Sequence, residues 1–129
     1  MVHDQHAAGR FLEVTIGKVP SLNAFYASKH WTARKKAKDL CYADVMRQLV
    51  KLEKVTFYEC CIEARVNYRY DIDNSIMAVK FALDAFRDWG GVPDDSPKYV
   101  KSVLIVKDTS LARDTARIIF RPVLQESLF

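Results

Sequence analysis

Two aspartates two positions apart, Asp71 and Asp73, are the side chains of this sequence best placed to do chemistry. They lie in the run YDIDN, residues 70–74, where a strand-like pattern passes into a helix-like one. In extended backbone, residues two apart point to the same face, so the two carboxylates would lie side by side. Such a pair repels unless a cation lies between, and Mg²⁺ needs one or two carboxylates with water and phosphate oxygens. We therefore predict a Mg²⁺ site here, with strand-end or N-cap solvation of the carboxylates as the alternative.

The helix expected after this pair adds a cation to the candidate site. At 100° per residue, Lys80 lies about 20° to one side of Asp73 and Asp84 about 20° to the other, which gives one polar stripe. Lys80 leans toward the start of the helix, where it would stabilise charge on a reacting phosphate. An ion pair between Lys80 and Asp84, four residues apart, is the alternative. Asp84 lies three turns from the aspartate pair, so we favour a structural role for it.

The charges are unevenly distributed along the 129 residues. The chain has 20 Lys and Arg against 16 Asp and Glu, a net charge of +4, yet residues 28–38, SKHWTARKKAK, contain no acid. The acidic residues gather instead in residues 71–95, which include a second pair, Asp94 and Asp95. Basic segments hold phosphates, and carboxylates hold the cation that offsets phosphate charge. The distribution is typical of a metal-dependent enzyme that acts on a polyanion.

The elements that must position these side chains alternate between strand and helix. Hydrophobic periodicity predicts strands over 11–19, 54–70, 98–107 and 114–121, and helices over 32–52 and 74–88. Turn residues predict a turn at 20–23, a loop at 24–30, a long loop at 89–97 and a hairpin connection at 108–114. The order β-α-β-α-β-β indicates an α/β fold with a mixed sheet and two main helices. We expect a single domain over residues 1–129, with residues 1–10 as a mobile tail.

Finer expectations concern the caps and the buried faces of these elements. Thr32 is the expected N-cap of the first helix and Asp73 that of the second. In the long strand, the alternate residues from Tyr58 to Tyr68 are expected to face the core. The expected apolar positions of the helices are Leu40, Ala43, Val45, Met46, Leu49, Val50 and Leu52 in the first, and Ile76, Val79, Ala82, Leu83 and Phe86 in the second.

Several classes of protein are excluded by the composition. Three cysteines without a CxxC spacing argue against a disulfide framework or a thiolate zinc site, and favour buried thiols in a reducing cytoplasm. No apolar run approaches the roughly 18 residues that span a membrane, and the N-terminus has no secretory signal pattern. We therefore expect a cytoplasmic protein with no membrane partner and no organic cofactor.

The run of residues 70–100 resembles the RusA-type Holliday-junction resolvases. That family combines a DxDN at a strand-to-helix junction with an LDAL-like helical stretch, a Gly/Trp turn and a DD pair. The matching segments here are DIDN at 71–74, LDAF at 83–86, WGG at 89–91 and DD at 94–95. PSLN at 20–23 is also similar to the family's Pro-Ser-x-Asn turn, which a basic aromatic loop follows. The resemblance covers most of residues 11–121.

The resemblance implies a homodimeric endonuclease that needs Mg²⁺, with Mn²⁺ as a substitute. Its substrate would be Holliday junctions or related branched DNA, cut by paired symmetric nicks in bacterial or phage recombination and repair. The family's catalytic, metal-binding carboxylates match Asp71, Asp73 and Asp95, with Asp94 as the alternative to Asp95. The family's catalytic lysine falls on Met77 instead, and the nearest candidate, Lys80, lies about 4.5 Å further along the helix axis.

The basic residues are expected to contact DNA phosphates in a salt-sensitive manner that is largely blind to sequence. The expected contacts are Lys29, His30, Arg34, Lys35, Lys36 and Arg69. For the aromatic residues Phe25, Tyr26 and Trp31 we favour a place in the core over stacking on unpaired bases.

Three other interpretations stay open. Met77 at the lysine position favours a module that binds branched DNA without cutting it. The carboxylates also suit a metal-dependent nuclease acting on flaps or RNA. A purely structural α/β domain would leave the acidic cluster and the acid-free basic run as coincidence.

Overall fold

Strands and helices alternate along the chain in the α/β order that the sequence predicts. The structure, a computed structural model, describes residues 10–27 and 30–123. The elements are β1 (Leu12–Ile16), α1 (Leu22–Ala27), α2 (Trp31–Leu49), β2 (Cys60–Val66), the 3₁₀ helix η1 (Ile72–Ser75), α3 (Ile76–Trp89), β3 (Val100–Lys107) and β4 (Ala116–Pro122). The predicted α/β class with a mixed sheet and two main helices is confirmed. The predicted tail falls largely on residues 1–9, which lie outside the described residues.

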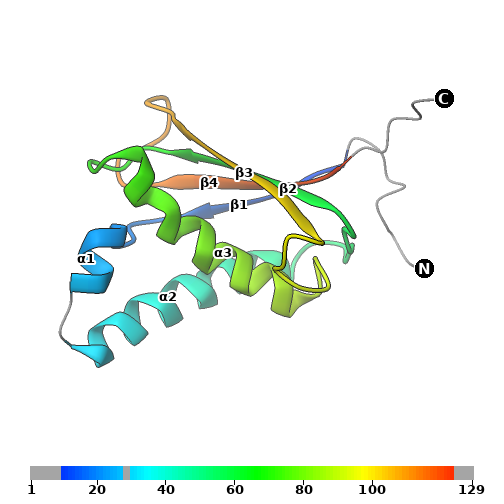
Figure 1. Ribbon diagram of the computed structural model, residues 1–129, viewed down its shortest axis with the longest axis horizontal. Helices are drawn as coiled ribbons and strands as arrows, with labels where there is room; N and C mark the ends of the chain where they lie inside the picture. The colour runs from blue at the N-terminus through cyan, green and yellow to red at the C-terminus, as the bar shows by residue number, and fades with distance from the viewer. Residues whose placement is uncertain (1–9, 28–29, 124–129) are drawn as a thin grey trace.

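The sheet has the strand order β1-β4-β2-β3, and α2 and α3 both cover one of its faces (Figure 1). β2 pairs in parallel with β3 and antiparallel with β4, which also pairs antiparallel with β1. The predicted hairpin between β3 and β4 is therefore wrong, because β2 lies between them. The crossover through α3 returns the chain parallel to β2, and β4, which is more buried than β3, lies on the other side of β2.

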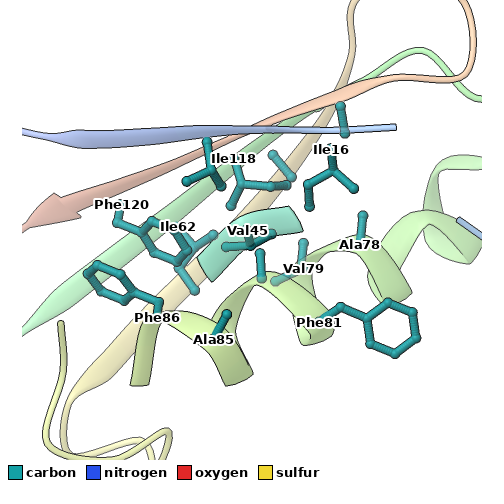
Figure 2. Close-up of a cluster of buried hydrophobic side chains, with 14 of the residues drawn as sticks. Ile16, Val45, Ile62, Ala78, Val79, Phe81, Ala85, Phe86, Ile118 and Phe120 are labelled. Carbon is teal, nitrogen blue, oxygen red and sulfur yellow. The ribbon is translucent and has the colours of Figure 1, made fainter. Parts of the chain in front are cut away.

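The core lies between the sheet and its two helices. Figure 2 shows Ile62 of β2 and Phe120 of β4 above Val79 and Phe86 of α3. The Phe86 and Phe120 rings stack with their centroids 3.9 Å apart. The predicted alternation in the long strand is confirmed from Cys60 to Tyr68, but Tyr58 is exposed, since β2 begins only at Cys60.

The predicted loop at 24–30 and the predicted N-cap of α2 both differ from the structure. The predicted loop at 24–30 contains most of α1, because the Ser21 Oγ accepts a hydrogen bond from the Ala24 N–H and caps a helix there. Thr32 is not the N-cap of α2: His30 holds that position, and its side chain makes no capping hydrogen bond.

α2 buries a narrower stripe than its sequence predicts. Cys41, Val45 and Leu49 are buried at a spacing of four, which gives one straight line of contact with α3 and β1. Leu40, Val50 and Leu52 are exposed instead. In α3, Val79, Ala82 and Phe86 are buried as predicted, and Ile76 and Leu83 pack against the core while half-buried.

Candidate metal and nucleic-acid site

Two tyrosines fix the segment that leads from β2 to the aspartate pair. The Tyr68 hydroxyl donates a hydrogen bond to the Gly17 carbonyl over 2.7 Å, and the Tyr70 hydroxyl donates to the Val19 carbonyl over 3.0 Å. The two rings stack with centroids 5.1 Å apart. Burial raises the pKa of Tyr70 to about 12 and raises the pKa of Tyr68 as well, so both remain neutral donors. Arg69 lies between them and is exposed.

Asp71 and Asp73 lie where this segment enters the helical layer. Asp71 is extended and precedes η1, whereas Asp73 lies within η1. The expected extended backbone thus stops at Asp71, and Ser75 rather than Asp73 is the N-cap of α3. Both aspartates are exposed, and within residues 10–27 and 30–123 neither carboxylate has a hydrogen-bond or ion-pair partner. Two carboxylates without protein partners suit the donor set of Mg²⁺, which completes its shell with water and phosphate oxygens.

The asparagine that follows the aspartate pair ties it to α1. The Asn74 Oδ1 accepts a hydrogen bond from the Asn23 N–H over 3.3 Å, and the Asn74 N–H donates to the Asp71 carbonyl over 2.9 Å. α1 packs against η1, and the Phe25 ring of α1 lies 5.6 Å from the Phe81 ring of α3. These contacts hold η1 against the fold while the carboxylates of Asp71 and Asp73 face solvent.

A basic cleft of about 700 Å³ lies beside this segment. Its lining includes three cations, Arg69, Lys107 and Arg113, and no acid; the remaining residues are Asn67, Tyr68, Thr109 and Leu111. The Lys107 Nζ donates a hydrogen bond to the Tyr68 carbonyl over 2.6 Å, which fixes that cation at the cleft wall. Such a cleft concentrates anions, and its cations would contact the phosphates of a nucleic acid.

Sequence reasoning missed Lys107 and Arg113, because each stands singly at one end of the β3–β4 connection. The pairing of β2 with β3 brings Lys107 beside Arg69, and the pairing of β2 with β4 brings Arg113 there. The connection is held in place by Asp108, which accepts hydrogen bonds from the Ser110 N–H over 3.0 Å and from the Arg65 Nε over 2.8 Å. The hydrogen bonds from Ser110 and Arg65 lower the pKa of Asp108 to about 2, so this anchor stays charged.

Lys80 does not form the predicted ion pair with Asp84. It is exposed on α3 and has no hydrogen-bond or ion-pair partner among the described residues. Asp84 pairs instead with Lys38 of α2, at 3.8 Å, and with Arg87, at 4.0 Å. The predicted Lys80–Asp84 pair is therefore wrong, and the two ion pairs of Asp84 support the structural role that we favoured for it. Because each 3₁₀ residue of η1 turns about 120°, Asp73 is also rotated away from the predicted polar stripe.

Met77, the position that matches the family's lysine, faces the core. Its side chain is only 2% exposed. The start of α3 therefore presents Lys80 as its exposed cation, one turn beyond the position at which the resemblance would place a lysine.

The second acidic pair lies at the opposite end of α3 (Figure 1). Asp94 and Asp95 follow the 14-residue helix, which is about 21 Å long. The Asp95 Oδ2 lies 3.1 Å from the Arg87 Nη1, and Arg87 also pairs with Asp84 and Asp88. Within a single chain, Asp95 therefore lies far from Asp71 and Asp73. Within the described residues no three His, Cys, Asp or Glu side chains gather closely enough to hold a metal.

The basic segment forms the first turns of α2. Lys35 and Lys36 are exposed, Arg34 is half-buried, and His30 is the exposed N-cap, whereas Lys29 lies outside the described residues. Lys35 pairs with Asp39 over 2.7 Å.

The aromatic residues of this region are not all in the core, contrary to the interpretation we favoured. Trp31 is 63% exposed and Tyr26 is 57% exposed. Phe25 is half-buried and packs against Phe81. Two of the three aromatic rings are therefore accessible to a ligand.

No model of a protein family matches the chain, and no curated protein matches it significantly. The resemblance to the resolvases therefore rests on the residues quoted above. Among the described residues, no helix has both the length and the apolar character that crossing a membrane would require.

Proposed function

We propose that this protein is a metal-dependent endonuclease that resolves Holliday junctions or related branched DNA as a homodimer. The observation that carries the proposal is the exposed pair Asp71 and Asp73, without protein partners, beside a cleft lined by Arg69, Lys107 and Arg113. A metal-dependent site that cuts nucleic acid uses both features, because anionic ligands bind the divalent ion and cations bind the polyanion.

Each group would have a distinct role. Asp71 and Asp73 would hold Mg²⁺, which when bound activates water and offsets charge at the reacting phosphate. Arg69 and Arg113 would position the DNA backbone in the cleft through phosphate contacts. Lys80, which has no partner among the described residues, is the nearest cation of α3 and would stabilise negative charge electrostatically.

In the proposed homodimer, Asp95 would complete the metal site of the second copy. Asp95 lies about one helix length from Asp71 and Asp73 of its own chain, so it can complete a metal site only from a second copy. A two-fold axis that places the start of α3 of one chain beside the end of α3 of the other would form two such sites. Paired symmetric nicks require two sites.

Mixing two inactive variants tests this arrangement. We expect Asp73→Asn and Asp95→Asn each to lose cleavage alone. Heterodimers formed by unfolding and refolding them together should regain single-strand nicking, because one of their two sites has all its carboxylates. Nicking of a labelled junction, measured before and after mixing, is the readout. No recovery, with mixed dimers confirmed by a size tag on one variant, would place Asp95 outside the metal site.

A second candidate function, binding of branched DNA without cleavage, is favoured by two observations. Met77 is buried where the family has its lysine, and Asp95 is paired with Arg87. The basic cleft serves binding equally well in either case.

Cleavage of a labelled four-way junction in Mg²⁺ separates the two functions. We expect symmetric paired nicks in the junction, none in a linear duplex of the same sequence, and none in EDTA. Tight junction binding without nicks would leave the binding module as the function. Equal binding and cutting of junction and duplex would overturn the branched-DNA proposal in both forms.

A further inference from the structure

A second cavity, of about 390 Å³, lies between α1 and the first turns of α2. Its lining residues are Phe25, Trp31, Arg34, Lys35, Lys38 and Asp39. It is separate from the basic cleft and shares no residue with it. A cavity of this size is in the range that holds small organic groups, and it combines aromatic rings with cations.

The aromatic part of the lining offers a stacking surface. Phe25 is held by edge-to-face contacts with Tyr26, at 5.3 Å between centroids, and with Phe81, at 5.6 Å. Trp31 is 63% exposed, although a large apolar ring is ordinarily buried. A flat ligand that stacks on Trp31 would remove this surface from water without any rearrangement of Phe25.

The lysine and arginine side chains of the lining differ in whether they have an ion-pair partner. Lys35 pairs with Asp39 at 2.7 Å, and Lys38 pairs with Asp84 at 3.8 Å. Arg34 has no ion-pair partner among the described residues, and its Nε is shielded from solvent without a hydrogen-bond acceptor. An anionic ligand in the cavity would give the Arg34 guanidinium, which lines it, a charged hydrogen-bond acceptor. The cavity therefore suits a ligand with a flat aromatic part and an anionic part.

The position of the cavity relates it to the aspartate pair. α1 provides Phe25 to the cavity, and the same helix holds η1 through the hydrogen bond between Asn23 and Asn74. A DNA strand whose phosphate lies near Asp71 and Asp73 would run past α1 toward this cavity. The bases of an intact duplex are stacked and paired, whereas a branch point provides unpaired ones.

We propose that this cavity binds one unstacked nucleotide of branched DNA, with its base on Trp31 and its phosphate at Arg34. The inference rests on the proposed function and deepens it: phosphate contacts bind any DNA, and the cavity selects DNA that has an unpaired base. The flatness of the base matters more than its identity, so selection should be for structure rather than sequence.

Binding of three labelled DNAs, followed by fluorescence anisotropy without Mg²⁺, tests the inference. The probes are a four-way junction, a ten-nucleotide oligothymidine and a linear duplex. We expect Trp31→Ala to weaken junction and oligothymidine binding about 5- to 150-fold, the range of one lost base–aromatic stack, and duplex binding less than 2-fold. Trp31→Phe, which keeps a ring, should restore most of the loss.

Two further variants serve as controls. Tyr58→Ala removes an exposed aromatic ring beside β2 and should leave all three affinities unchanged. Arg113→Ala removes a cation of the basic cleft and should weaken all three probes alike.

The outcomes separate this inference from the proposed function. Wild-type protein that prefers the junction, with Trp31→Ala indistinguishable from it, would overturn the cavity alone. An equal loss for all three probes in Trp31→Ala would also overturn it, because the cavity would then be a general phosphate site. Failure of the wild type to bind any of the DNAs would overturn the proposed function as well.

Discussion

Replacing Asp73 by Asn is expected to reduce Mg²⁺-dependent junction cleavage at least about 1,000-fold while leaving junction binding within about 2-fold. Stabilisation of charge by a bound metal contributes several kcal/mol to such reactions, and 1.4 kcal/mol corresponds to a tenfold change in rate. An amide keeps the shape of the side chain and removes the charge that holds the ion. Asp73 is exposed and has no partner among the described residues, so the free energy of unfolding should change by no more than about 0.5 kcal/mol.

Single-turnover cleavage of a labelled junction, with binding measured in Ca²⁺ or EDTA, gives both quantities. Asp94→Asn is the matched control, since it removes an exposed carboxylate at the other end of α3. Titration of Mg²⁺ adds a direct readout: the variant should need a much higher concentration for any residual activity. Cleavage at the wild-type rate in Asp73→Asn would remove the aspartate pair from the mechanism and with it the proposed metal site.

The parts of this fold that the sequence predicts are those set by local periodicity. The alternation from Cys60 to Tyr68 places each side chain on its observed face, because the pleat of a strand alternates sides whatever surrounds it. The position of β3 could not be read in the same way. Two adjacent strands in sequence suggest a hairpin, and only the packing of α3 on the sheet decides that β2 separates them.

The grouping of the acidic residues around the candidate site could not be predicted from the sequence either. Six aspartates in residues 71–95 predict one acidic region, but α3 separates them into two groups. Arg87 forms ion pairs with three members of the group at the end of the helix, Asp84, Asp88 and Asp95. The pair before the helix has no such cation. Spacing in sequence cannot distinguish these groups, because Arg87 reaches its partners through the helical turn and the loop that follows.

Met77 is buried at the start of α3, at the position where the resolvases that the sequence resembles have a lysine. Substituting lysine there should destabilise the fold by about 3–5 kcal/mol at pH 7. The Met77 side chain is 2% exposed among core residues, and burial lowers the pKa of a lysine by several units from about 10.4. Between the lowered folded pKa and pH 10.4 the unfolded chain would bind a proton that the folded chain resists, so the penalty is larger at pH 7 than at pH 10.

Urea unfolding of Met77→Lys, Met77→Leu and wild type at pH 7 and pH 10 tests this. Met77→Leu, nearly equal in volume, should cost less than about 1.5 kcal/mol at both pH values. The difference between the two variants isolates the charge from shared effects of alkaline pH on tyrosines and cysteines. A lysine variant as stable as wild type at pH 7, with faster junction cleavage, would mean that this position opens toward Asp71 and Asp73. The expected loss of stability without a gain in cleavage would instead mean that this chain cannot use a lysine at residue 77, and that its α3 cation is Lys80.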